Sequence, residues 1–323
     1  MFKKYIIRTA KTVALPLILF VFFFILRPQK FGSWSTINIM FQQTFIPTII
    51  GYGLSWGFIV GIWDFTVGAR ILLSALVGAS FSVQFGMAGL ILGCLISSLT
   101  LSVLTGAINW IARIPSLVIS FGLVMVYEIL GQWYSGKTSL MTVDSKITFL
   151  GSEPYNIILS VCVFVIFYII FNNTKFSFQA KAVGSNEMLS RDMGIKVPKV
   201  KFMTYVWGGL FLGLASLLQI SYAGSIGPQV NLTSIAVVFR PMIGLMIGIA
   251  LSHVCNLAIG VFIGTLSINT IFIGIIALGL PDTMQNIFLG IFLLVVMIVS
   301  NQQERVKEYF KRKKMAAANQ ITA

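Results

Sequence analysis

The chain has 323 residues, of which 57% are hydrophobic and only 10% are charged, and its mean hydropathy is +0.92. A soluble globular protein has about a quarter of its residues charged, so this composition excludes that class and indicates a membrane protein. The net charge of +14 does not indicate a nucleic-acid partner, because the basic residues gather in separate islands between apolar runs.

Three basic islands hold 16 of the 23 Lys and Arg residues. They lie at the N-terminus, in the segment 172–201 and in the C-terminal tail 301–323. Basic islands between apolar runs are typical of cytoplasmic segments under the positive-inside rule. We therefore predict a multi-pass protein of the cell membrane whose two termini and 172–201 segment are cytoplasmic.

The N-terminal segment resembles a signal peptide, with basic residues followed by an apolar run from Val13 to Leu26. No small-residue cleavage site follows this run, since Arg27, Pro28 and Gln29 come next. We expect an uncleaved first membrane span.

Ten apolar segments are long enough to cross a bilayer, which takes about 20 residues in a helix. They are residues 12–28, 44–62, 66–84, 88–108, 114–134, 155–171, 202–222, 230–251, 256–278 and 284–300. Six spans before the 172–201 segment and four after it place all three basic islands on one side. The predicted fold is an all-α polytopic membrane protein with a single transmembrane domain over 1–323. An alternative is that a piece of 63–87 enters the membrane and returns to the same side.

Small residues recur at intervals of four within these spans, as in Gly53, Gly57 and Gly61. In lipid this spacing permits helices to pack closely against one another. The alternative interpretation is that such helices slide along one another. A weak internal echo aligns Leu90–Thr105 with Val261–Ile276 and matches Gly93 to Gly264. The echo predicts two pseudo-repeated halves, an arrangement that in transporters places the substrate path at the repeat interface.

Polar residues inside the apolar spans are candidates for a translocation pathway because they are costly in hydrocarbon. They are Asp64, Glu128, Gln219, Arg240 and Asn269. Glu128 and Arg240 alternatively form a structural ion pair or a capped hydrogen-bond site. Asp64 is expected to cap the following helix, with its carboxylate accepting hydrogen bonds from the amides of Thr66 and Val67.

Catalytic and cofactor motifs are not predicted. Residues 131–138 match the phosphate-binding pattern G-x-x-x-x-G-K-T, but a phosphate cradle needs a strand before the loop and a helix after it, and here a membrane helix precedes it. His253 is the single histidine, and no nucleophile–base set or metal-ligand spacing occurs. Cys94, Cys162 and Cys255 are expected to be free, and no cofactor or metal is predicted.

Two segments carry a family resemblance. Gly51–Ala75 reads G-Y-G-L-S-W-G-F-I-V-G-I-W-D-F-T-V-G-A-R-I-L-L-S-A and Ala182–Ile195 reads A-V-G-S-N-E-M-L-S-R-D-M-G-I. The first resembles the signature of permeases of ribose-type ATP-binding-cassette (ABC) importers, which belong to the branched-chain amino acid and sugar permease superfamily. The second resembles the segment with which those permeases press on the ATPase. The sequence departs from the family at Met188 and Leu189, where an alanine pair is usual, and after Val238, where a Gly-rich loop is usual.

The resemblance implies a coupling element formed by Gly184, Asn186, Glu187, Arg191, Gly194 and Ile195. From the residues themselves, a short amphipathic turn between glycine hinges is expected to expose Met188, Leu189 and Met193 for insertion into a cleft of a partner.

The resemblance also implies the function, which is that of the membrane permease of an ABC importer for a monosaccharide or related small polar solute. Its implied partners are separate ABC ATPase subunits, an extracytoplasmic substrate-binding protein and a second permease, as homodimer or heterodimer. The alternatives are a nucleoside or branched-chain amino acid permease, or a secondary transporter or channel that uses Glu128 as its coupling carboxylate. The sequence does not identify the solute.

Overall fold

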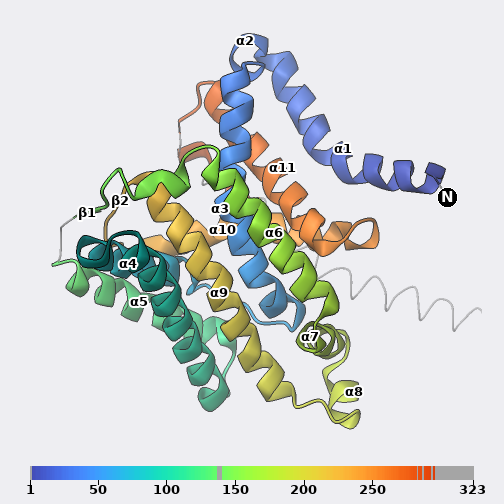
Figure 1. Ribbon diagram of the computed structural model, residues 1–323. Helices are drawn as coiled ribbons and strands as arrows, with labels where there is room; N and C mark the ends of the chain where they lie inside the picture. The colour runs from blue at the N-terminus through green and yellow to red at the C-terminus, as the bar shows by residue number, and fades with distance from the viewer. Residues whose placement is uncertain (1, 137–139, 282, 286, 292–293, 295–323) are drawn as a thin grey trace, which may run out of the picture.

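The computed structural model describes residues 2–136, 140–281, 283–285, 287–291 and 294. The protein is a bundle of helices, with one two-residue strand pair (Figure 1). Its helices are α1 (Phe2–Leu26), α2 (Pro28–Phe31), α3 (Trp34–Ile59), α4 (Val67–Ala112), α5 (Ser116–Tyr134), α6 (Tyr155–Asn173), α7 (Lys175–Ser185), α8 (Glu187–Asp192), α9 (Val197–Ala223), α10 (Ala236–Ala250) and α11 (Leu257–Ala277). The short elements are β1 (Met141–Thr142), β2 (Ser225–Ile226), η1 (Thr148–Gly151), η2 (Thr233–Ile235) and η3 (Leu251–His253).

Six segments of the described chain are long and apolar enough to cross a membrane: α4, α5, α6, α9, α11 and the continuous stretch Thr233–His253 that contains α10. A shorter apolar stretch, Thr12–Leu26, lies within α1. These helices make the chain an all-α, multi-pass membrane protein, as the composition predicts. Most of the predicted span 284–300 and the basic tail 301–323 lie outside the described residues.

The helix α4 contains a sharp reversal at Gly86, whose φ of 57° and ψ of −138° are not helical. Its two arms pack against each other through glycines. A Cβ atom added to Gly93 would lie 2.8 Å from Cα of Gly78. The arms correspond to the predicted spans 66–84 and 88–108, and glycine at these positions permits their close packing.

A second glycine-packed hairpin joins α10 to α11. A Cβ atom added to Gly264 would lie 2.1 Å from the carbonyl oxygen of Gly244, and one added to Gly260 would lie 2.8 Å from that of Gly248. Gly93 and Gly264 are the positions that the internal sequence echo matches, and each lies at the close approach of its own hairpin.

The centre of the bundle is formed by α3 and α9, whose backbones meet at Gly53 and Gly208. A Cβ atom added to Gly208 would lie 2.8 Å from the carbonyl oxygen of Gly53. On its other side α3 contacts α11 through a polar seam, in which Thr48 and Thr265 share a hydrogen bond of 2.6 Å between their hydroxyl oxygens. Small and hydroxyl side chains therefore join the central helices, as expected where lipid supplies no hydrophobic driving force between them.

The segment 172–201 differs from the predicted loop because most of it is helical. Thr174 caps α7 by accepting a hydrogen bond from the amide of Ser177. Asn186 caps α8 by accepting one from the amide of Leu189. Figure 1 shows α7 and α8 together at one end of the bundle, opposite to the end that carries α2.

Candidate functional site

The helix α8 is a short surface helix fixed at both ends by its sequence. Asn186 caps its N-terminus, and its C-terminus closes with hydrogen bonds from the amide of Gly194 to the carbonyl of Arg191 (2.9 Å) and from the amide of Ile195 to the carbonyl of Ser190 (3.0 Å). Gly194 has a φ of 81°, which side chains other than glycine and asparagine rarely adopt. The glycine is therefore required by this turn.

Three large apolar side chains of α8 and of the residue that follows it point away from the protein. Met188 is 77% exposed, Leu189 56% and Met193 72%. The expectation that these three residues are displayed is confirmed. Apolar side chains grouped in this way on a charged surface are typical of sites of interaction with another molecule.

Charged side chains fix α8 from the side. Glu187 accepts hydrogen bonds from Arg191 (2.6 Å) and from Lys201 of α9 (2.8 Å). The bond to Lys201, together with the charges of both basic groups, lowers the pKa of the Glu187 carboxyl below its ordinary value. Glu187 and Arg191 thus form one ion-pair network with Lys201, a residue that the predicted coupling element did not include.

Gly184 was expected to be a hinge, but it lies inside α7 and serves a close approach. A Cβ atom added to it would lie 2.0 Å from the carbonyl oxygen of Ile59, at the C-terminus of α3. Any other residue would push α7 away from α3. Gly184 and Gly194 are therefore required for different reasons, the first steric and the second conformational.

Aromatic side chains fill the space between α7 and the core. Trp56 of α3 is fully buried, and its ring lies 5.2 Å from Phe167 of α6 and 6.0 Å from Phe176 of α7, measured between ring centroids. Its indole nitrogen donates a hydrogen bond to Ser177 Oγ (3.3 Å). These aromatic contacts join α7 to α3 and α6 in a closely packed cluster.

Beyond the end of α3, residues 60–66 form a non-helical segment that leads to α4 and carries Asp64. The Asp64 carboxylate accepts hydrogen bonds from the amide (2.9 Å) and the hydroxyl (2.6 Å) of Thr66. The predicted hydrogen bond from the Thr66 amide is confirmed, but the structure gives none from Val67. The predicted cap is wrong, because Thr66 itself is the N-cap residue of α4 and this helix has no side-chain cap. The same carboxylate forms an ion pair with Arg70 of α4.

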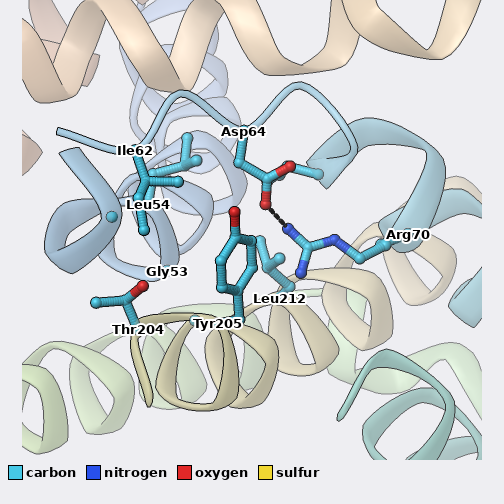
Figure 2. Close-up of a pocket in the computed structure, with 11 residues that line it drawn as sticks. Gly53, Leu54, Ile62, Asp64, Arg70, Thr204, Tyr205 and Leu212 are labelled. Carbon is cyan, nitrogen blue, oxygen red and sulfur yellow. Dashed lines mark hydrogen bonds and ion pairs between the residues drawn. The ribbon is translucent and has the colours of Figure 1, made fainter. Parts of the chain in front are cut away.

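This ion pair is deeply buried, with 2% of the Arg70 side chain and 8% of the Asp64 side chain exposed. Arg70 also donates a hydrogen bond to Ser102 Oγ (2.7 Å) on the second arm of α4. Figure 2 shows Tyr205 of α9 with its hydroxyl directed toward the segment that carries Asp64. A cavity of about 20 Å³ lies between these groups, Gly53 and Gly208, which is room for one water molecule and too little for a sugar.

Glu128 lies in α5 and caps a helix from the second half of the chain. Its two carboxylate oxygens accept hydrogen bonds from the amides of Leu232 (2.8 Å) and Ser234 (2.9 Å), where η2 and α10 begin. This is the capped hydrogen-bond arrangement, one of the two alternatives for Glu128. A negative charge at a helix N-terminus is also favoured by the helix dipole.

The remaining predicted polar residues lie in three different places. Arg240 donates a hydrogen bond to Gln285 (2.6 Å) and lies 4.2 Å from the centroid of the Phe272 ring. Asn269 donates a hydrogen bond to Thr44 Oγ1 (3.1 Å) in the seam between α3 and α11. Gln219 is half-buried in α9. The structure therefore does not gather the predicted pathway residues into one site, and it does not pair Arg240 with Glu128.

Sequence reasoning missed two residues of the buried pocket, Arg70 as the partner of Asp64 and Tyr205. A signal for Arg70 was present, since it lies six residues after Asp64 in an apolar run and a buried cation needs a nearby anion. No local signal identified Tyr205, which comes from a helix more than 130 residues away in the sequence.

Comparison with known proteins gives a consistent set of relatives. The family model described as branched-chain amino acid transport system / permease component matches residues 36–297. The ribose import permease protein RbsC of Bacillus subtilis is 28% identical over 302 residues, covering 88% of this chain and 90% of the relative. The fructose import permease protein FrcC of Rhizobium meliloti is 23% identical, covering 91% and 86%. The autoinducer 2 import system permease protein LsrC of Photorhabdus laumondii is 23% identical, covering 91% and 92%. No solved structure gives a significant match.

Proposed function

The chain belongs to the family of permease components of branched-chain amino acid transport systems, and we propose that it imports a monosaccharide or a related small polar solute. Members of this family and the relatives found are transport permeases of ABC importers rather than enzymes. The choice of a sugar over an amino acid or nucleoside is supported by the ribose and fructose importers among the relatives.

The exposed apolar surface of α8 carries the proposal of an ATP-driven importer. Met188, Leu189 and Met193 fit the hydrophobic cleft of a separate ATPase subunit, and Arg191 lies at the rim of that cleft. A secondary transporter needs no such surface. It needs instead a carboxylate that binds and releases a coupling ion, whereas Glu128 is held by two backbone amides.

We propose that a displacement of α8 is transmitted to the bundle through one series of direct contacts. A displacement of α8 moves α7, which is covalently continuous with it through Asn186. Gly184 and the aromatic side chains transmit this displacement to the end of α3. The end of α3 continues into the 60–66 segment, so the displacement reaches the Asp64–Arg70 pair at the start of α4.

In this proposal the polar residues of the spans have different roles. Asp64, Glu128 and Arg240 hold helices in place through their own neighbours. Gln219 and Asn269 remain candidates for contact with the solute. The 20 Å³ cavity is closed to a sugar in this conformation, so the solute path opens only when the helices move.

The wider arrangement follows the same proposal. The chain forms ten spans in two pseudo-repeated halves, with the paired glycine hairpins of α4 and of α10–α11 as corresponding units. The 172–201 segment and both termini are cytoplasmic, as the basic islands favour. ABC ATPase subunits, an extracytoplasmic binding protein and a second permease, identical or not, complete the transporter.

Transport by the reconstituted complex tests the function. The permease is combined in proteoliposomes with the ATPase and binding protein encoded beside it, and ATP-dependent uptake of labelled ribose and fructose is measured. Leu189→Glu should abolish uptake and co-purification of the ATPase while leaving the permease folded. Lys199→Gln, on the exposed start of α9, is the control and should retain both.

Two outcomes contradict the proposal. Uptake that persists without the ATPase and follows a proton or sodium gradient would identify a secondary transporter. Reporter fusions at Asp144 and Lys196 should lie on opposite sides of the membrane, and the same side for both would refute the proposed topology.

A further inference from the structure

The outer surface of the bundle contains an apolar groove that the transport function does not use. It has a volume of about 280 Å³ and is formed by residues of α3, α6 and α11, among them Phe45, Tyr52, Val161, Phe164, Ile259 and Phe262. Figure 1 shows α6 running alongside α3 and α11, which places these three helices next to one another. The lining is mostly apolar, and its three hydroxyl groups, on Thr48, Tyr52 and Ser160, already donate to backbone carbonyls, so the groove is poorly suited to a sugar.

The groove opens toward the lipid rather than toward a solvent pathway. Val161 is 54% exposed and Ile259 is 40% exposed, and both belong to helices long enough to cross the membrane. A groove of this kind within a bilayer is filled by hydrocarbon, because no water is present there to occupy it.

One face of α6 connects the groove to a polar border. Val161 and Phe164 line the groove, Tyr168 stacks on Phe164 with ring centroids 6.4 Å apart, and Asn172 continues the same face one turn later. Asn172 accepts a hydrogen bond of 2.9 Å from Asn256, which precedes α11. This Asn172–Asn256 bond closes the space between α6 and α11 at the end that carries α7.

Positive charge lies directly beyond this border. Lys175 is exposed at the start of α7. Lys181 lies further along α7, with its ammonium 4.0 Å from the centroid of the Phe171 ring. At 1.5 Å per helical residue, α6 rises about 14 Å from Phe164 to its last residue, Asn173, and Lys175 follows after the non-helical Thr174. This rise is close to the thickness of one leaflet of a hydrocarbon core about 30 Å across.

We propose that the groove binds one acyl chain of an anionic phospholipid, whose phosphate lies at Lys175 beside the Asn172–Asn256 bond. The apolar lining selects the chain and the lysine selects the charge of the headgroup. The placement of this lipid in the cytoplasmic leaflet rests on the proposed orientation of the 172–201 segment. The groove itself and the positive charge of Lys175 do not depend on that orientation. A lipid at this position contacts α3 at Tyr52, one turn before the aromatic residues that brace α7.

Photo-crosslinking of the full chain tests this site. The protein is placed in nanodiscs with a phosphatidylglycerol that carries a diazirine in the middle of one acyl chain, and labelled residues are located by mass spectrometry. We expect labelling concentrated on the peptides that contain Phe164 and Phe262. Val161→Trp, which fills the groove, should reduce this labelling at least fivefold. Ile166→Trp is the matched control on another lipid-exposed face of α6 and should leave it unchanged.

The headgroup is tested by repeating the measurement with phosphatidylcholine carrying the same diazirine chain. The unsubstituted protein should prefer phosphatidylglycerol, and Lys175→Gln should lower that preference about fivefold, whereas Lys199→Gln should not. Labelling spread evenly around α6, or unaffected by Val161→Trp, would overturn the site and indicate bulk lipid only. Loss of the lipid crosslinks because a protein segment occupies the groove would also overturn the lipid site. None of these readouts depends on transport, so failure of the lipid site leaves the proposed function intact.

Discussion

Asp64 and Glu187 each pair with basic side chains, but one pair is buried among helices and the other lies on the coupling surface. Around Asp64 the ion pair is enclosed by α3, α4 and α9. Around Glu187 the carboxylate is 40% exposed and the partner Arg191 is 63% exposed.

The difference in burial gives the two carboxylates different tasks. A buried charge that loses its partner costs several kcal/mol, because neither water nor another group replaces that partner. An exposed pair contributes little, since water solvates both groups when they separate. Breaking the buried pair is therefore expected to destabilise the fold, whereas the exposed pairs of Glu187 mainly orient α8.

The largest effect is expected from Asp64→Ala, which leaves Arg70 buried without an anion. We expect a loss of about 3–5 kcal/mol of folding free energy, measured by thermal unfolding of the purified protein in detergent. The double variant Asp64→Asn with Arg70→Met should be less destabilised than Asp64→Ala, because no unpaired charge remains. The single variants Asp64→Asn and Arg70→Met complete the double-mutant cycle, and single losses that add strictly to the loss of the double variant would show that the pair has no mutual stabilisation.

Glu128→Ala should have the next largest effect, because it leaves the amides of Leu232 and Ser234 without their acceptor. A loss of about 2–3 kcal/mol is expected. Glu128→Gln, which keeps an acceptor oxygen but not the charge, should lose about 1 kcal/mol. Hydrogen exchange at the start of α10 gives a local readout, and unchanged exchange in Glu128→Ala would contradict the capping role.

Substitutions at Gly184 and Gly194, the two glycines of the proposed coupling element, distinguish a steric requirement from a conformational one. Gly184→Ala should displace α7 and reduce the ATP turnover that is coupled to transport, because the Cβ atom of the new alanine meets the Ile59 carbonyl. At Gly194 a Cβ atom meets nothing within 4 Å, so only the left-handed backbone matters. Gly194→Val should therefore uncouple transport, whereas Gly194→Asn should retain it. Equal effects of valine and asparagine at 194 would exclude a backbone cause.

The smallest effect is expected from Glu187→Gln, which removes an exposed ion pair worth about 0.2–1 kcal/mol. Because the pKa of Glu187 is lowered in the folded protein, its contribution is present above the ordinary glutamate pKa and is lost as the pH falls through the lowered value. Unfolding midpoints measured between pH 7 and pH 3 should converge for Glu187→Gln and the unsubstituted protein at the acid end. A difference that grows toward low pH would contradict this sign.

Much of the architecture was predictable because hydropathy and short-range patterns determine it. The predicted spans 66–84, 88–108 and 114–134 correspond to the arms of α4 and to α5, since a membrane helix must be long and apolar. The hydrogen bond between Asp64 and Thr66 joins residues only two positions apart. The exposure of Met188, Leu189 and Met193 follows from a short segment that is too polar to enter the bundle.

Contacts between distant parts of the sequence were decided by the tertiary structure alone. The Glu128 carboxylate meets amides more than 100 residues away, and Gly184 meets Ile59, which is also more than 100 residues away. No local pattern encodes these pairs, because an apolar helix face is compatible with many neighbours and only packing selects one. By itself the sequence determined the membrane class, the places of the apolar helices α4 and α5 and the hydrogen bond between Asp64 and Thr66, whereas packing decided which carboxylate caps which helix and where α7 and α8 meet the bundle.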